Sequence, residues 1–161
     1  MLLTTSKNLK SEYKKIAKKF SKAVWGLSFS SRKNRSLEDL STLALKKYES
    51  SVGVFGVLDK KFVIKKYFYN PKLDIFEWDK KFLLLWNLKF SSEKVSFLPP
   101  IKIESIGKKE LLRFLELNSE PLAEILIPNN FLIKVSKNLA TFFYNKKETL
   151  SFNFSIQEGV K

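Results

Sequence analysis

The chain of 161 residues contains no cysteine and no histidine. These absences exclude disulfide bonds, zinc sites built from Cys and His ligands, cysteine nucleophiles and histidine general bases. Only five glycines are present, and their scattered positions match neither a P-loop nor a dinucleotide-binding fingerprint. An enzyme built from this chain would therefore work with lysine, arginine, carboxylates, tyrosine, hydroxyl groups and backbone dipoles, and we expect no cofactor.

Long apolar runs are also missing. The longest apolar cluster, Phe82 to Trp86, has the length of a strand, whereas a helix that crosses a bilayer needs roughly 20 apolar residues. Lysines interrupt each apolar stretch near the N-terminus, so no signal-peptide core is expected. Hydrophobic residues nevertheless make up 44% of the chain, including 15 Phe, which is enough to build a core. The composition predicts one soluble domain.

Acidic residues are few compared with basic ones. Sixteen Asp and Glu oppose 30 Lys and Arg, which gives a formal net charge of +14. Such a surface attracts nucleic acid, anionic lipid or small polyanions. Arginine is scarce, however, with only Arg32, Arg35 and Arg113, and arginine is the residue that binds phosphate and guanine through two hydrogen bonds. This scarcity disfavours a nucleic-acid partner.

The excess of Lys, Asn, Ile and Phe has a second explanation, because all four residues have AT-rich codons. Codon drift could raise the net charge without any partner being selected. A compact AT-rich genome would place the protein in the plastid (chloroplast) stroma, or alternatively in the cytoplasm of an AT-rich bacterium.

The first fifty residues are predicted to be helical and basic. Apolar residues recur at helical spacing over 8–25, with lysines on the other face, and Gly26 is a suitable stop. We favour a packed surface helix over a membrane-surface helix or a transit peptide, because this segment contains Glu12 and lacks arginine. A Ser-rich loop follows, and Ser36 is the expected N-cap of a second helix, with Asp39 completing a capping box.

From residue 51 onward the hydrophobic period changes to two, which predicts strands. Short helices are expected over 108–117 and 122–127, and 130–140 is ambiguous, with helix favoured at its start. Tight turns between strands indicate an α+β fold, with an antiparallel sheet of about six strands and helices on one face. The expected strand pairs are 52–58 with 61–68, 78–88 with 93–98, and 142–144 with 149–156.

Three segments of the second half carry a family resemblance. They are Trp78 to Leu84 (WDKKFLL), Phe114 to Ile127 (FLELNSEPLAEILI) and Asn145 to Ile156. In order and spacing they are similar to segments of the chorismate pyruvate-lyases, in the plastid-encoded or cyanobacterial-type branch. That family shares its fold with ligand-binding domains of transcription factors.

The resemblance implies one chorismate lyase-like domain over 1–161, with a basic helical part (1–50) and a sheet-containing core (51–157). It implies conversion of chorismate to 4-hydroxybenzoate and pyruvate, a step of quinone biosynthesis. Lys80 and Lys81 fall where the family holds a substrate carboxylate. Asn153 falls at the family's catalytic acid position, and Leu122 lies in the substrate-binding Pro-Leu turn. The resemblance implies no metal ion in this site.

The sequence departs from the family at these positions. Lysine lacks arginine's bidentate grip on a carboxylate, and Asn153 cannot take up a proton. Whether catalysis is retained therefore stays open. One alternative is a non-catalytic module on the same fold that binds a small anionic aromatic or dicarboxylate ligand. A second alternative is a basic protein associated with nucleic acid.

Overall fold

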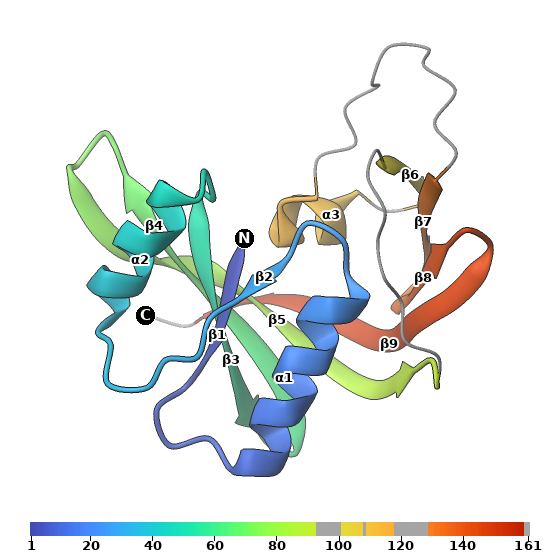
Figure 1. Ribbon diagram of the computed structural model, residues 1–161, viewed down its shortest axis with the longest axis horizontal. Helices are drawn as coiled ribbons and strands as arrows, with labels where there is room; N and C mark the ends of the chain where they lie inside the picture. The colour runs from blue at the N-terminus through green and yellow to red at the C-terminus, as the bar shows by residue number, and fades with distance from the viewer. Residues whose placement is uncertain (93–100, 108, 118–128, 160–161) are drawn as a thin grey trace.

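The computed structural model describes residues 1–92, 101–107, 109–117 and 129–159 (Figure 1). Three helices are present in this part of the chain, α1 (Ser11–Ala23), α2 (Leu37–Lys46) and α3 (Glu110–Leu115). The strands are β1 (Leu2–Thr5), β2 (Ser28–Phe29), β3 (Ser51–Leu58), β4 (Lys61–Asn70), β5 (Ile75–Phe90), β6 (Ile101–Gly107), β7 (Asn129–Ser136), β8 (Leu139–Tyr144) and β9 (Lys147–Glu158).

All of these strands form one mixed sheet in the order β2-β1-β3-β4-β5-β9-β8-β7-β6. β1 is parallel to both β2 and β3, and β6 is parallel to β7, while the other pairs are antiparallel. The prediction of an antiparallel sheet of about six strands was therefore wrong. It missed β1 and β6, and it favoured helix at the start of the segment that forms β7.

The locally encoded elements match their predictions. α1 lies within the expected helix 8–25, and both predicted hairpins, β3–β4 and β8–β9, are formed. Each hairpin turns through two residues in the left-handed region, Asp59 and Lys60 (φ 47° and 63°) and Asn145 and Lys146 (φ 48° and 68°). Two consecutive positive φ angles are typical of the type I′ turn, whose twist matches that of the paired strands. The predicted strand 93–98 and helix 122–127 lie outside the described residues.

The sheet contains the same topology twice. In the first unit β1 is parallel to β3, the first strand of the meander β3-β4-β5. In the second unit β6 is parallel to β7, the first strand of the meander β7-β8-β9. The two units meet where β5 pairs antiparallel with β9, with Leu85 opposite Phe154. An approximate two-fold axis therefore passes through the middle of the sheet.

Helices cover both faces of the sheet, which corrects the prediction that they lie on one face. α1 and α3 share the larger hydrophobic core with alternate residues such as Phe55 of β3. α2 packs on the opposite face, where Leu40 and Ala44 contact a smaller core that includes Val52 and Val54. Because successive residues of a strand point to opposite faces, one strand supplies both cores.

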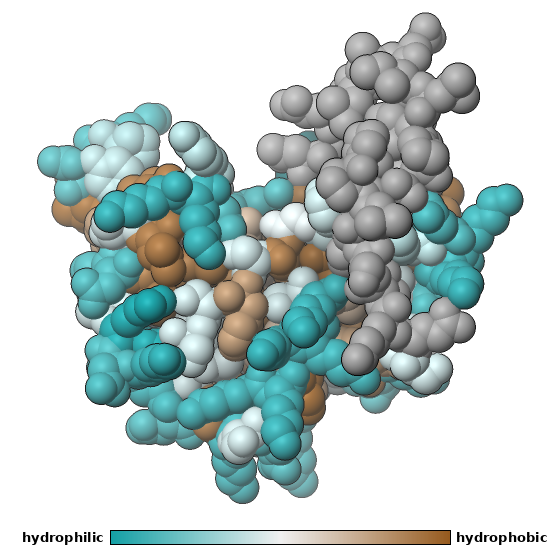
Figure 2. Space-filling model, in the orientation of Figure 1, coloured by the Kyte–Doolittle hydropathy of each residue, from teal (hydrophilic) through white to brown (hydrophobic). Residues whose placement is uncertain are grey.

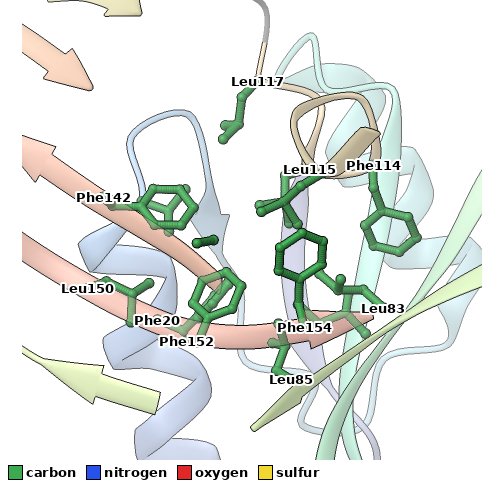
Figure 3. Close-up of a cluster of buried hydrophobic side chains, with 14 of the residues drawn as sticks. Phe20, Leu83, Leu85, Phe114, Leu115, Leu117, Phe142, Leu150, Phe152 and Phe154 are labelled. Carbon is green, nitrogen blue, oxygen red and sulfur yellow. The ribbon is translucent and has the colours of Figure 1, made fainter. Parts of the chain in front are cut away.

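One helix of each unit, α1 or α3, also contacts the strands of the other unit. Phe20 of α1 lies against Phe152 of β9, with ring centroids 5.6 Å apart, and Figure 3 shows it beside Leu150 and Phe152. The Thr149 hydroxyl donates to the Ala23 carbonyl at 3.2 Å. In the other direction, Glu116 at the end of α3 lies 2.9 Å from the Lys66 Nζ of β4. Through these contacts of α1 and α3 with the strands of the other unit, which we call the exchange of helices, the two units share one core.

The last strand, β9, shows the expected alternation of apolar and polar residues. Leu150, Phe152 and Phe154 are buried in the larger core, and Ile156 packs against it. These alternate residues therefore place one side of β9 on the core, as a hydrophobic period of two requires.

Candidate nucleic-acid interface

The residues assigned to a substrate site lie at separate places. Asn153 is half-buried, lies opposite Trp86 in the sheet, and accepts a hydrogen bond from Asn87 Nδ2 at 3.1 Å. Lys81 lies opposite Glu158 in the same strand pair. It is five residues from Trp86 in β5, which places it about 17 Å from the position of Asn153. Its Nζ is 3.9 Å from Glu110 Oε1 of α3. Lys80 is exposed next to Lys81, so the structure does not bring these lysines to Asn153, and Leu122 lies outside the described residues.

The acidic residues around the β4–β5 turn are each occupied by a different donor. Asp74 accepts from the Tyr69 hydroxyl. Glu77 accepts from Asn70 Nδ2 at 2.5 Å, and Asp79 accepts from the backbone N–H of Lys81 at 2.9 Å. In the part of the chain that the structure describes, no three carboxylates gather in a way that could hold a metal ion.

The exposed face of α1 is strongly basic. Packing determines which face this is, because Ala17 and Phe20 are buried beneath the helix. Glu12 is the acid within it, and none of its exposed lysines forms an ion pair with another described residue. Figure 2 shows hydrophilic side chains gathered over this helix. We call the exposed lysines of this segment the lysine face: Lys10, Lys14, Lys15, Lys18, Lys19 and Lys22.

The spacing of the lysine face forms a row of positive charge. Lys14, Lys18 and Lys22 recur every four residues, about 6 Å apart along the helix axis, so the row is about 12 Å long. Lys19 Nζ lies 4.8 Å from the centroid of the Phe90 ring, an attractive contact that anchors its side chain against β5. The row can therefore meet successive negative groups on an extended polyanion.

A groove of about 740 Å³ opens at the C-terminal end of the lysine face. Here the chain leaves α1, turns through Gly26 (φ 87°) and enters β2, which runs beside the helix (Figure 1). A side chain at Gly26 would be strained at this φ and would lie 3.2 Å from Leu117 Cδ2. The groove is lined by Lys18, Ser21, Lys22, Val24, Trp25, Gly26, Leu27, Ser28, Phe29 and Glu49.

The groove combines cations with aromatic walls. Lys18 and Lys22 belong both to its lining and to the lysine face, and Trp25 and Phe29 also line it. Ammonium groups bind phosphates, and aromatic rings offer surfaces on which bases stack. Sequence reasoning identified the basic helix but missed the groove, because 27–35 was interpreted as a loop. The signal was weak, since β2 has only two residues, Ser28 and Phe29.

Fold and site together define a class of protein: a mixed-sheet domain with a basic helix suited to binding a polyanion. The sequence matches no family model, and no curated protein matches it. Among solved structures, the chain is similar to a probable ribosomal biogenesis protein from Aeropyrum pernix, with a TM-score of 0.63 and 14% identity over 99% of this chain and 96% of the other. It is also similar to Mil, an archaeal Imp4-like protein, with a TM-score of 0.64 and 14% identity over 99% of both chains. At this identity the likeness establishes the fold.

These neighbours correct the chorismate lyase interpretation. They are ribosomal biogenesis and Imp4-like proteins, so both the predicted family and the predicted formation of 4-hydroxybenzoate and pyruvate are wrong. The alternative of an aromatic-acid-binding module relied on the same fold and loses its basis with it. The three segments that resemble the chorismate lyases indicated the wrong family, because short helix, turn and strand patterns recur in unrelated folds.

The expectation that the chain carries no membrane-spanning helix agrees with the structure as far as it is described. Its longest described helix, α1, has 13 residues, and no described helix is long and apolar enough to span a bilayer. The expectation of a small anionic aromatic or dicarboxylate ligand finds no support.

Proposed function

We propose that this protein is a non-catalytic RNA-binding domain that acts in ribosome biogenesis and contacts RNA phosphates through the lysine face of α1. The observation that carries the proposal is the row of lysines without acidic partners among the described residues. The fold, shared with ribosomal biogenesis and Imp4-like proteins, supports RNA as the polyanion.

The use of lysine indicates the kind of contact. A lysine ammonium is a flexible point charge, whereas arginine offers the planar geometry that reads guanine. Phosphate contacts position a protein on its nucleic acid but carry little sequence information. The scarcity of arginine therefore argues against base-specific readout by α1, and it leaves backbone binding intact. We expect the lysine face to bind structured RNA with little sequence preference.

The test compares two double charge reversals. Lys14→Glu with Lys15→Glu changes the lysine face away from the groove, and the matched control, Lys47→Glu with Lys72→Glu, changes two exposed lysines outside α1. Binding of a paired RNA hairpin is measured by fluorescence anisotropy between about 50 and 200 mM salt.

The α1 variant should weaken binding at least tenfold and reduce the salt slope of log K by about 2, because each lost phosphate contact removes roughly 0.9 from that slope. The control variant should change the binding affinity and the salt slope much less. Equal losses in the two variants would show that affinity comes from total charge, and no binding by the wild type would overturn the proposal.

A further inference from the structure

The groove at the end of α1 has the shape and chemistry to receive one nucleotide. We propose that it binds a single unpaired nucleotide of an RNA whose neighbouring phosphates lie along the lysine face. This inference rests on the proposed RNA-binding function and adds the class of RNA that the protein prefers, namely paired RNA interrupted by an unpaired residue.

The size and walls of the groove fit a base. Its volume of about 740 Å³ lies within the range of small-molecule sites, roughly 300–1,000 Å³. Val24 and Leu27 supply apolar lining, and Trp25 and Phe29 supply aromatic rings. Stacking on aromatic side chains is open to every base, because every base has a π face.

The polar groups are placed for the two ends of a nucleotide. Lys18 and Lys22 lie where the groove meets the lysine face, so a phosphate can stay on the row while its base enters the groove. Ser28 belongs to the groove lining, and its Oγ is buried there without a hydrogen-bond partner among the described residues. An unsatisfied buried hydroxyl is unfavourable, so rotation of the Ser28 side chain toward the edge of a base in the groove would gain a hydrogen bond.

Glu49 lies in the same lining. Its Oε2 is 3.4 Å from the Met1 amino group, which offsets its charge, and it also has no hydrogen-bond partner among the described residues. Because Oε2 is buried and lies beside the Met1 amino group, Glu49 adds little negative charge that could repel a phosphate at the groove.

The occupant must be unpaired. A base within a duplex is stacked on both faces and its pairing edge is occupied, so it cannot reach these walls. An unpaired base can be splayed out and bound at its face and edge together. Lysines continue along α1 away from the groove, which favours a nucleotide inside an RNA chain over a free nucleotide.

The experiment uses a Trp78→Phe, Trp86→Phe background, in which Trp25 is the remaining indole. Two RNA hairpins are compared, one fully paired and one with a single bulged adenine. The bulged hairpin should bind about tenfold more tightly, since stacking of one base contributes roughly that much, and it should quench Trp25 emission. The paired hairpin should bind without this quenching.

Ser28→Leu removes the unpartnered hydroxyl and fills the groove, while Ser31→Leu makes the same change at an exposed position outside it. Circular dichroism confirms that both variants are folded. Ser28→Leu should abolish the preference for the bulged hairpin and leave binding of the paired hairpin unchanged, and Ser31→Leu should retain the preference.

The outcomes separate the two proposals. Equal binding of both hairpins by the wild type, or an unaltered preference in Ser28→Leu, overturns the groove inference alone. Failure of the wild type to bind either hairpin overturns the proposed function as well. If Ser28→Leu does not fold, Phe29→Ala in the same background replaces it, and an unaltered preference in that variant overturns the groove inference.

Discussion

Glu116 is a single residue that fixes α3 against the strands of the first unit. It ends the helix at φ 57° and accepts hydrogen bonds from the Ser51 hydroxyl at 2.6 Å and from Lys66 Nζ at 2.9 Å. Lys66 Nζ also lies 5.6 Å from the centroid of the Phe114 ring. Burial raises the pKa of the Glu116 carboxyl, but the hydrogen bonds from Ser51 and Lys66 outweigh it, so this pKa lies below its usual value of 4.5.

Glu116→Gln should lower the free energy of unfolding at neutral pH by about 1–3 kcal/mol, because Lys66 loses its charged partner in a largely buried place. The folded pKa is depressed, so the stabilisation is present above the unfolded value near 4.5 and is lost as pH falls through the folded pKa. Urea titrations of both proteins at pH 7 and at acidic pH test this, and the difference should shrink in acid.

Glu110→Gln is the matched control on the same helix. The Glu110 side chain is 60% exposed and lies 3.9 Å from Lys81 Nζ, so its removal should cost no more than about 1 kcal/mol. A pH-independent loss in Glu116→Gln would show that its role is packing alone.

At the scale of elements, α2 illustrates a helix whose start is encoded within four residues. The Ser36 hydroxyl accepts from the Asp39 N–H at 3.0 Å, and the Ser36 N–H donates to Asp39 Oδ2 at 2.9 Å, so the predicted capping box is confirmed. The backbone N–H of Ser36, and then its hydroxyl, hold the pKa of Asp39 below its ordinary value.

Ser36→Ala should therefore destabilise the protein by about 1 kcal/mol, since it leaves an N–H of the first turn without its acceptor. Thr42→Ala, at an exposed position inside the same helix, should be neutral or slightly stabilising. Thermal unfolding followed by circular dichroism compares them. Equal melting temperatures for Ser36→Ala and wild type would contradict a role for the cap.

At the scale of the whole molecule, the exchange of helices predicts that the two units unfold together. Phe20 of α1 is fully buried and contacts both Phe55 of β3 and Phe152 of β9. Phe20→Ala should cost about 3–5 kcal/mol, as expected for a large aromatic removed from a core. The loss of stability should be the same by two probes. Trp fluorescence follows the first unit, because all three tryptophans lie within residues 1–92, and hydrogen exchange of the amides in β7, β8 and β9 follows the second unit.

Phe143→Ala serves as the comparison, because this ring is half-buried under Lys134 and its loss should cost less. If Phe20→Ala shifts only the Trp transition and leaves the amides of the second unit protected, the units fold independently.

The sequence by itself determined the elements whose causes lie within a few neighbouring residues. The helical period over 8–25, the Ser36 capping box and the two hairpins were readable because they depend on local hydrogen bonds and local burial. The basic face of α1 was readable for the same reason, because it follows from the helical spacing of its lysines.

Only the tertiary structure decided the mixed sheet, the exchange of α1 and α3, and the groove. β1 has four residues, too few to show a period, and its parallel partner β3 begins about fifty residues later. In β7, Phe131, Ile133 and Val135 alternate as a strand requires, but Leu132 makes the run continuously apolar, and periodicity alone does not separate helix from strand in a short apolar run. The groove joins residues of α1, β2 and Glu49, and no local pattern brings them together, because long-range strand pairing sets their positions.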